Sequence, residues 1–445
     1  MRLPSSPMYK VDRCNTVTLK FYLETYGCSL NTADSDIIVG RLQKLDAERV
    51  QEIHDADLII LNSCGVKEPT EDRIIHRLEE LSKETSPVVV AGCLPRISLS
   101  RIERAIPDYA AILGPQSIES LASVVPRILS GERGIQHLDS DEVSKLKWFE
   151  GPPDSVICTV PICEGCLGNC AYCAVRFARG QVRSYSVDDI HRVIERCTHL
   201  GYKEIRLTSQ DAAVFGSDTG ETLASLLDDV GQIEGTHKFR LGMFNPNLVL
   251  DSIDDILEAM ESPRFFKFFH IPLQTGSDSV LKAMKRRYTV AEWEMIVGRI
   301  RERFSDATIA TDIIAGFPGE NDSDFEQTLD VIRMIRPSVV NISKYGDRPR
   351  TLASKSKNKV NTHTKKNRSR ALTILVNDIL RESNESWVGW SGPIILTEKG
   401  SKGGIVGRNE SYKTVIIQEE KNLGSTVNVE ITSAERTHLN GEIKL

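Results

Sequence analysis

The sequence lacks the features that would place it in a membrane or an export pathway. No apolar run approaches the roughly 18 residues that a membrane span needs. The first residues, MRLPSSPMYKVDRCN, lack the apolar stretch of a secretory signal. We therefore expect a cytoplasmic protein with no membrane partner. An overall excess of positive charge is also missing, since the net charge is −6, so any nucleic-acid-binding surface must be local.

Cysteine, in contrast, is grouped in a way that indicates chemistry. The chain has ten cysteines in 445 residues, and a reducing cytoplasm argues against a disulfide framework. The stretch VPICEGCLGNCAYC holds Cys166, Cys170 and Cys173 in a C-x3-C-x2-C spacing, with Cys163 in front. Such a loop lets three thiolates reach three irons of one 4Fe–4S cluster and leaves the fourth iron for a chelating small molecule. A zinc site with Cys163 as the fourth ligand is the alternative.

Three more cysteines end the strand-like runs of residues 17–130. In that region short apolar runs alternate with amphipathic helices, which predicts a parallel α/β domain. The runs FYLETYGC, DLIILNSC and PVVVAGC end at Cys28, Cys64 and Cys93. Ligands bind at the carboxyl ends of such strands, so the three thiols are expected to converge. Three thiolates without a fourth favour an iron–sulfur cluster over a closed zinc site; three buried, inert cysteines are the alternative.

Two further domains are expected. Between residues 152 and 385 the cysteine loop follows one strand, and five more strand-like runs are separated by helical segments. Together they make about six βα units, which predict a partial or complete barrel whose site lies at the strand carboxyl ends. Residues 387–445 change to short alternating strands with glycine-rich turns, which is typical of a small β-barrel.

The order of these motifs resembles the radical S-adenosylmethionine methylthiotransferases of transfer RNA. The resemblance covers nearly the whole chain. It is carried by YGCSLN, NSCGV, AGCLPR, EGCLGNCAYCAVRFARGQVRSY, LTSQD, HIPLQTGSD and DIIAGFPGE. GCLGNCAYC with ARG, followed by LTSQDAAVFGSD, is most similar to the archaeal and eukaryotic branch, which acts on threonylcarbamoyladenosine next to the anticodon. The last domain resembles the TRAM domain that carries RNA in these enzymes.

The resemblance implies two 4Fe–4S clusters and S-adenosylmethionine as cofactors, and a flavodoxin or ferredoxin as electron donor. The implied cluster ligands are Cys28, Cys64, Cys93, Cys166, Cys170 and Cys173. A radical derived from S-adenosylmethionine would activate C2 of the adenine, and the first cluster would present or donate the sulfur. No catalytic residue is expected beyond the cluster ligands. Cys163 departs from the family pattern and is expected to be a packed bystander.

Other strand ends offer contacts for S-adenosylmethionine. The candidates are Ser209, Gln210, Asp211, Gly316, Pro318 and Gly319. Capping of a strand end is the alternative for the first three, and a plain turn for Pro318 and Gly319. His270 is expected to be a hydrogen-bonded core histidine. Arg176 and Arg179 follow the cysteine loop and could meet a cofactor carboxylate or an RNA phosphate.

Positive charge is concentrated in one segment. Residues 344–370 hold ten Lys/Arg and one acid, Asp347, which indicates phosphate binding; a solvated helix face with a linker is the alternative. The candidate RNA contacts are Lys365, Lys366, Arg368 and Arg370. Three other functions stay open: methylthiolation of isopentenyl-adenosine in tRNA, methylthiolation of a ribosomal-protein aspartate, and a non-catalytic, metal-bound RNA-binding protein.

Overall fold

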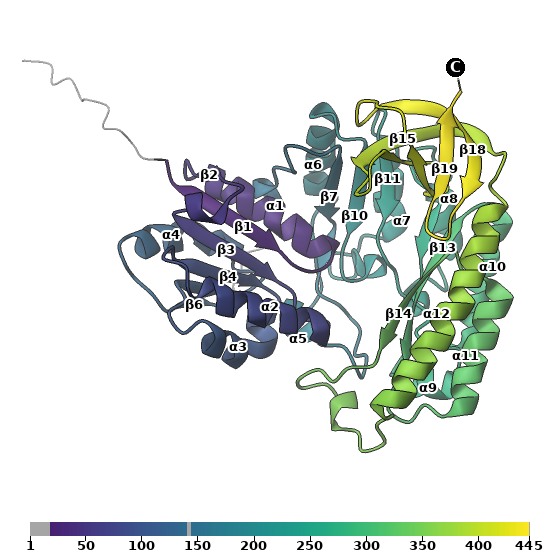
Figure 1. The fold of residues 1–445 in the computed structure, drawn as a ribbon, viewed down its shortest axis with the longest axis horizontal. Coiled ribbons are helices and arrows are strands. Elements are labelled where there is room, and N and C mark those ends of the chain that lie inside the picture. The colour runs from purple at the N-terminus through teal and green to yellow at the C-terminus, as the bar shows by residue number, and fades with distance from the viewer. Residues whose placement is uncertain (1–17, 140–143, 445) are drawn as a thin grey trace, which may run out of the picture.

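The first group of elements is a six-stranded parallel sheet with helices on both faces (Figure 1). The computed structural model describes residues 18–139 and 144–444. The sheet has the order β2-β1-β3-β4-β5-β6. Its strands are β1 (Lys20–Thr25), β2 (Glu48–Arg49), β3 (Leu58–Ser63), β4 (Val88–Gly92), β5 (Ala111–Leu113) and β6 (Ile135–His137). Every residue of β3 and β4 is buried, because helices cover both faces of a parallel sheet.

Two hydrophobic cores hold the helices of this sheet. The helices are α1 (Ser29–Gln43), α2 (Glu68–Leu81), α3 (Leu94–Ala105) and α4 (Leu121–Leu129). α1 and α4 pack on one face through Ile37, Leu42 and Val124. α2 and α3 pack on the other face through residues such as Ile74 and Ile102. The loops that follow β1, β3 and β4 therefore meet at one edge of the sheet.

The second group is an arc of six parallel strands. The strands are β7 (Ile157–Pro161), β10 (Glu204–Thr208), β11 (Lys238–Leu241), β12 (Phe268–His270), β13 (Thr308–Ala315) and β14 (Val339–Lys344). They form two three-stranded sheets, and a parallel bridge between Phe239 and Phe265 connects these sheets. Within the described residues, no pairing joins β7 to β14, so the arc stays open. The predicted α/β class and six βα units are confirmed.

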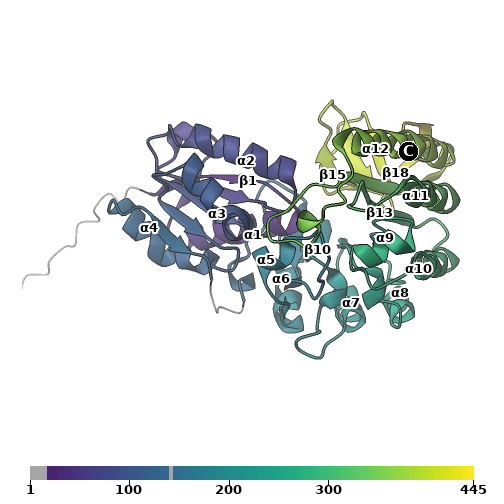
Figure 2. The ribbon, with the colours of Figure 1, turned by 90° about the horizontal axis from the view of Figure 1, so that it is seen from below.

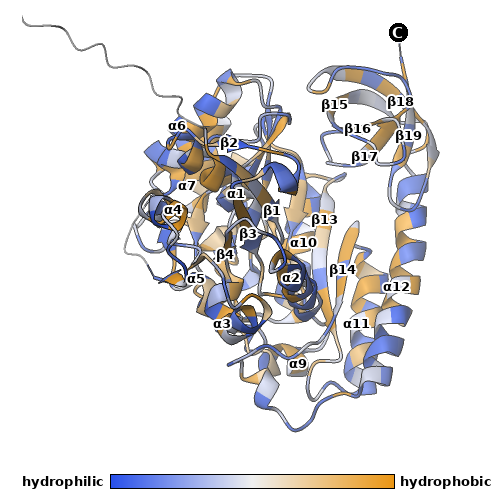
Figure 3. Ribbon diagram, turned by 60° about the vertical axis from the view of Figure 1, so that its left-hand side comes forward, coloured by the Kyte–Doolittle hydropathy of each residue, from blue (hydrophilic) through white to orange (hydrophobic). Residues whose placement is uncertain are grey.

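Helices cover the outer side of the arc, and the first domain lies beside it (Figure 2). The outer helices are α6 (Val187–His199), α7 (Leu223–Gly231), α8 (Ile253–Ala259), α9 (Asp278–Ala283), α10 (Val290–Arg303) and α11 (Asp322–Ile335). A long helix, α12 (Thr362–Glu385), runs beside α11 and β14 and leads to the last domain (Figure 3). Among the described residues, no helix is both long and apolar enough to cross a membrane.

The last domain is a closed barrel with the order β15-β16-β17-β19-β18. Its strands are β15 (Ser391–Lys399), β16 (Ile405–Arg408), β17 (Thr414–Ile417), β18 (Thr426–Ala434) and β19 (Leu439–Ile443), as the alternating pattern predicts. A loop of this barrel closes the amino ends of the arc: the ring of Tyr412 packs 4.9 Å from that of Phe266 and 5.1 Å from that of Phe268. The hydroxyl of Thr308 donates to the carbonyl of Ser411 at 2.6 Å.

Candidate active site

The first cysteine set (Cys28, Cys64 and Cys93) gathers at the carboxyl edge of the first sheet. Cys28 precedes α1, Cys64 follows β3, and Cys93 lies between β4 and α3. Because β1, β3 and β4 are neighbours in the sheet, the three thiols open on one cavity of about 820 Å³, which we name the central cavity. A Cβ at Gly27 would lie 2.9 Å from the Cβ of Cys64, so this turn needs glycine.

The opposite wall of the central cavity belongs to the arc. Thr208, Ser209 and Gln210 line it from the end of β10, Gly242 and Met243 from the end of β11, and His270 from β12. The first cysteine set therefore faces the carboxyl ends of the arc's strands. This is the edge at which open parallel sheets bind ligands.

The second cysteine set (Cys166, Cys170 and Cys173) lies in the loop between β8 (Cys163–Glu164) and α5 (Val175–Arg179). The three residues line a smaller pocket of about 180 Å³. The backbone N–H groups of Gly168 and Val175 donate to the sulfurs of Cys166 and Cys173, at 3.1 and 3.4 Å. Burial raises the pKa of Cys166 to about 11 and that of Cys173 to about 12. A positive metal centre would be needed to hold these groups as thiolates.

Cys163 has different surroundings. It is fully buried in the main hydrophobic core, and its sulfur lies 3.8 Å from the carbonyl oxygen of Asp211. Burial raises its pKa above the usual range. It is not among the residues that line the pocket of the second cysteine set.

A further cavity of about 700 Å³, which we name the lateral cavity, lies between the first domain and strands β13 and β14. Tyr172 and Cys173 of the cysteine loop line it, together with Asp312 and Tyr345. The segment Val66–Lys67, which follows Cys64, borders both the central and the lateral cavity. The two residues that follow the Cys64 loop thus also border the cavity that Cys173 of the second set lines.

The residues predicted to contact S-adenosylmethionine are divided by the structure. Ser209 and Gln210 line the central cavity, and the side-chain oxygen of Gln210 accepts from the N–H of Gly165 at 2.7 Å. Asp211 is almost fully buried. Its oxygens accept from the backbone and side chain of Asn245 at 3.0 and 2.5 Å. Asp211 therefore has the capping role that was the alternative, and it also lines a small pocket with Cys170; its contact with S-adenosylmethionine stays a prediction.

The turn after β13 lies outside the cavities described above. The N–H of Gly316 donates to Glu320 at 2.6 Å, and that of Gly319 donates to the carbonyl of Asn358 at 2.8 Å. A Cβ at Gly316 would overlap the side chain of Lys365. The close approach that Gly316 permits is to α12, and neither Gly319 nor Pro318 is brought to the cavities.

His270 was predicted to be a hydrogen-bonded core histidine; the hydrogen bond is present, but the residue is half-buried and not part of the core. Its ring lines the central cavity, and its Nε2 lies 3.0 Å from a carboxylate oxygen of Asp312. Burial opposes ionisation of Asp312, but hydrogen bonds from His270 and Asn341 and the charge of Lys67 lower its pKa. The pair therefore connects the two cavities, because His270 lines the central cavity and Asp312 lines the lateral cavity.

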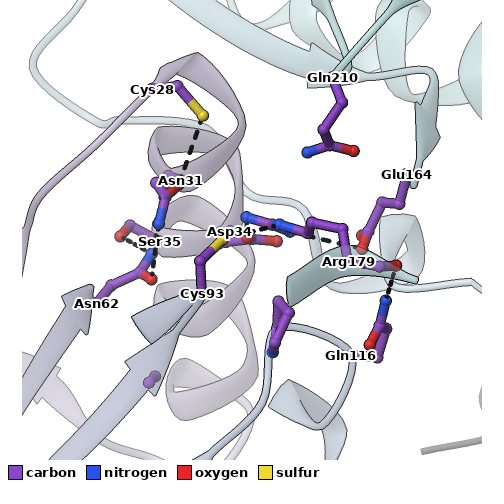
Figure 4. Close-up of polar contacts among 12 residues, drawn as sticks. Cys28, Asn31, Asp34, Ser35, Asn62, Cys93, Gln116, Glu164, Arg179 and Gln210 are labelled. Atoms are coloured by element: carbon purple, nitrogen blue, oxygen red, sulfur yellow. Dashed lines mark hydrogen bonds and ion pairs between the residues drawn. The ribbon is translucent and has the colours of Figure 1, made fainter. Parts of the chain in front are cut away.

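Arg176 and Arg179 have different environments. Arg176 is exposed and lines the small pocket of the second cysteine set. Arg179 is only 1% exposed, and its Nε donates to the sulfur of Cys93 at 3.1 Å (Figure 4). Its guanidinium also pairs with Asp34 at 2.6 Å. Enclosed in this way, Arg179 is not available to a cofactor carboxylate or an RNA phosphate, which corrects the expectation from sequence.

Comparison with known proteins covers nearly the whole chain. Models of the Radical SAM superfamily, of “Uncharacterized protein family UPF0004” and of the TRAM domain match residues 160–332, 20–114 and 387–444. A protein of Pyrococcus abyssi named probable threonylcarbamoyladenosine tRNA methylthiotransferase is 39% identical over 427 residues, covering 96% of this chain and 99% of that protein. The chain belongs to the threonylcarbamoyladenosine tRNA methylthiotransferase family. The resemblance seen in the motifs is confirmed.

Other methylthiotransferases of the family come from archaea and animals. Similarly named proteins are 41% identical in Methanothermobacter thermautotrophicus, over 95% of this chain and 99% of that protein, and 34% identical in Drosophila melanogaster, over 96% and 78%. Among solved structures, the radical S-adenosylmethionine methyltransferase TsrM of Kitasatospora setae superimposes with a TM-score of 0.58, over 76% of this chain and 75% of that one. At 13% identity that likeness concerns the fold alone.

Radical SAM membership implies S-adenosylmethionine and a 4Fe–4S cluster, and the cysteine loop fits the cluster. A Cβ on residue 168 would lie 3.1 Å from the sulfur of Cys166 and 3.6 Å from that of Cys170. Because Gly168 has no Cβ, this space beside the two thiols stays free. Within the part of the chain that the structure describes, no three His, Cys, Asp or Glu side chains are close enough to hold one metal ion. A 4Fe–4S cluster fits three thiols that are farther apart than the ligands of a single metal ion, because each thiolate binds a different iron.

Sequence reasoning missed Arg286 at this loop. Its Nη1 donates to the sulfur of Cys170 at 3.3 Å, and its Nε lies 3.3 Å from the hydroxyl of Tyr288. The sequence signal was weak, because Arg286 is the middle residue of the run Lys285–Arg287 and nothing in the run marks which cation turns inward. The structure gives the second cysteine set a half-buried positive neighbour.

The predicted RNA contacts of the methylthiotransferase lie on two sides of α12. Lys366 and Arg370 are exposed. Arg368 is buried and pairs with Glu320 and Asp322, both at 2.7 Å. Lys365 is half-buried and donates to the carbonyl of Tyr345 at 3.1 Å. Arg368 and Lys365 already have partners inside the protein, which removes them from the set of candidate phosphate contacts.

Proposed function

We propose that the protein methylthiolates C2 of N6-threonylcarbamoyladenosine next to the anticodon of tRNA, using two 4Fe–4S clusters. The observation that carries this proposal is the central cavity. One wall holds the first cysteine set and the other holds the strand ends of the arc, so a base bound between them contacts both. The names of the relatives support the substrate.

The proposal assigns one cluster to each cysteine set. When bound, the clusters and S-adenosylmethionine supply the radical that activates C2 of the adenine and the sulfur that is attached there. Cys166, Cys170 and Cys173 would hold one cluster, and Cys28, Cys64 and Cys93 the other. Tyr172 and Cys173 line the lateral cavity, which makes that cavity the place for S-adenosylmethionine beside the open iron.

The chain's own residues hold this arrangement in place. Gln210 connects the end of β10 to the cysteine loop by accepting from Gly165. The guanidinium of Arg286 donates a hydrogen bond to the sulfur of Cys170. His270 of the central cavity and Asp312 of the lateral cavity fix each other by a contact of 3.0 Å. Together these contacts keep the cysteine loop and the cavity wall in one geometry.

Two cations of the central cavity suit the threonylcarbamoyl group. Lys67 and Arg73 line this cavity and are exposed, and neither has an ion-pair partner within the described residues. The threonine moiety of the substrate carries a carboxylate, whereas an isopentenyl group carries no charge. An unpaired cation therefore favours threonylcarbamoyladenosine over isopentenyl-adenosine.

We also propose the division of labour between domains. Residues 17–130 would carry the first cluster, residues 152–385 the radical chemistry, and residues 387–445 part of the RNA contact; residues 17 and 445 lie outside the described residues. A flavodoxin or ferredoxin would supply the electron. The enzyme would work in the cytoplasm, where its tRNA substrate is found.

The test is an iron and cleavage assay on anaerobically reconstituted protein. The native chain should bind about eight irons, as two four-iron clusters require. The combined substitution Cys28→Ala, Cys64→Ala and Cys93→Ala should halve the iron, leave reductive cleavage of S-adenosylmethionine intact and abolish methylthiolation. Loss of cleavage in this folded variant would contradict the proposed assignment.

A further inference from the structure

A buried group of charges connects the first cysteine set to the arc. Arg179, at the end of α5, reaches across the domain boundary to Cys93, and its Nε lies 3.1 Å from the sulfur. The contact is closed to solvent, since Arg179 is 1% and Cys93 3% exposed. The N–H group therefore meets the sulfur at a buried point of the wall of the central cavity, which both residues line. Figure 4 shows the guanidinium directed from the α5 side toward Cys93 and Asp34.

Two carboxylates and one ammonium group surround this donor and fix its direction. Asp34 of α1 and Glu164 of β8 flank the guanidinium, at 2.6 and 3.5 Å. Lys145 lies between the same two carboxylates, at 2.8 Å from Asp34 and 2.5 Å from Glu164. Burial opposes the charge, but Asp34, Cys93 and Glu164 raise the pKa of Arg179 well above its ordinary value. The two Nη groups contact the carboxylates, and Nε is left for the sulfur.

The backbone adds a further restraint. The side-chain amide of Gln116, from the first domain, donates to the carbonyl of Arg179 at 2.5 Å. The hydroxyl of Tyr185 donates to Glu164 at 2.7 Å. Both the main chain and the guanidinium partner of Arg179 are thus held. Buried ion pairs of this kind contribute little net stability to the fold. Their effect is to orient the guanidinium of Arg179.

We propose that Arg179 is a positioning residue of the first cluster: it donates an N–H···S hydrogen bond to the Cys93 thiolate from the neighbouring domain and raises the reduction potential of that cluster. The inference rests on the proposed function, because it needs a cluster on Cys28, Cys64 and Cys93. Hydrogen bonds to the sulfurs tune the potential of such clusters. The donor stabilises the reduced form more, because that form carries more negative charge. The potential then depends on correct docking of the two domains.

The test uses the full chain with Cys166, Cys170 and Cys173 replaced by alanine, so that one cluster remains. In this background we compare Arg179→Lys with Lys145→Met. Arg179→Lys keeps the positive charge but loses the directed Nε donor, whereas Lys145→Met disturbs the same carboxylates without contacting sulfur. The readouts are iron content, and the midpoint potential from a redox titration followed by electron paramagnetic resonance.

We expect Arg179→Lys to lower the midpoint potential and Lys145→Met to leave it near that of the parent. Selective loss of iron from Arg179→Lys would also support the positioning role. Equal potentials in Arg179→Lys and the parent, or equal shifts or iron losses in the two variants, would overturn the inference alone. Absence of any cluster from the parent background would overturn the two-cluster function, and the inference with it.

Discussion

Cys163 and Cys166 lie three residues apart and have opposite surroundings. Cys163 is fully buried among apolar side chains, whereas Cys166 is half-buried and accepts an N–H from Gly168 in an open loop. The strand ends between them, so the side chains point to different regions. At the residue scale, the exposure and the backbone donors of a thiol separate a packed cysteine from a candidate ligand.

Replacing Cys163 by alanine should therefore leave the iron content unchanged. The cost is the removal of a buried side chain, which destabilises by about 1–3 kcal/mol without touching the cysteine loop. Iron analysis and the visible spectrum after reconstitution check this, with Cys166→Ala as the matched control. If Cys163→Ala loses as much iron as Cys166→Ala, a four-thiolate site is the better account.

Lys67 is expected to select the substrate through its charge. Lys67→Gln should weaken binding of tRNA that carries threonylcarbamoyladenosine by about tenfold to a hundredfold, since a hydrogen bond to a charged group contributes about 1.5–3 kcal/mol. Binding of the same tRNA with unmodified adenosine should change little. Lys83→Gln, an exposed lysine just beyond α2, is the control. Equal weakening of both tRNAs would make Lys67 a phosphate contact instead.

Asp36 is expected to make stability depend on pH. Burial raises its pKa to about 7, against about 3.9 in an unfolded chain. The folded state therefore favours the protonated form, and stability is lost as pH rises through about 7. The difference corresponds to roughly 4 kcal/mol at most, at about 1.4 kcal/mol per pKa unit.

Asp36→Asn should consequently melt at a higher temperature than the native chain at pH 8, with a smaller gain at pH 5. Thermal melts at the two pH values measure this. Asp108→Asn, at an exposed aspartate, should show no such pH dependence. A gain for Asp36→Asn that is equal at both pH values would point to a cause other than ionisation.

At the scale of elements, the basic helix α12 has both a buried side and an exposed side. Arg368, Leu372, Val376 and Ile379 are buried at helical spacing, and Lys366 and Arg370 lie on the exposed side. The apolar stripe could have been extended backward from Leu372 to Arg368 in the sequence. What the sequence could not provide were the carboxylates of Glu320 and Asp322, which come from a different element.

Neutralising Lys366 and Arg370 together should weaken binding of all tRNAs alike. The slope of log affinity against log salt should flatten by roughly 0.7–0.9 per lost phosphate contact. Lys365→Gln on the same helix should leave the slope unchanged and lower the melting temperature, because Lys365 is bound to Tyr345. Filter binding over a salt series measures both. An unchanged slope in the double variant would make this face ordinary solvated surface.

Local sequence patterns predicted the buried strands and the small barrel. Continuous apolar runs such as Leu58–Ser63 and Val88–Gly92 predicted buried parallel strands, and the cysteines after them lie at one edge, as strand order requires. The small barrel followed from alternation and glycine-rich turns. Local patterns of this kind depend on neighbours in sequence, which is why they could be read from the chain.

At the scale of the whole molecule, contacts between domains were beyond the sequence. Asp34 pairs with Arg179 of α5 at 2.6 Å, and Arg348 contacts the carbonyl of Gly65 at 2.5 Å across 283 positions. Tyr412 of the small barrel packs against Phe266 at the amino ends of the arc. In the sequence alone, charged and aromatic residues at such boundaries cannot be distinguished from surface residues, because the position of the partner domain is not known.

The arrangement also places functions at different ends of the arc. The small barrel docks at the amino ends of β12 and β13, through Phe268 and Thr308, and the first cysteine set faces the carboxyl ends. A bound tRNA would have to reach along the molecule, from an RNA-binding surface to the central cavity. That geometry suits a long substrate with one reacting base.

The central claim is the reaction on threonylcarbamoyladenosine, and mass spectrometry of tRNA nucleosides tests it most directly. Cells with and without the gene are compared, and the missing gene is restored as the native chain or with Cys28→Ala. The account predicts a methylthio-threonylcarbamoyladenosine peak with the native chain alone, and accumulation of threonylcarbamoyladenosine in the other two strains. An unchanged peak without the gene, or loss of a methylthio-isopentenyl-adenosine peak instead, would contradict it.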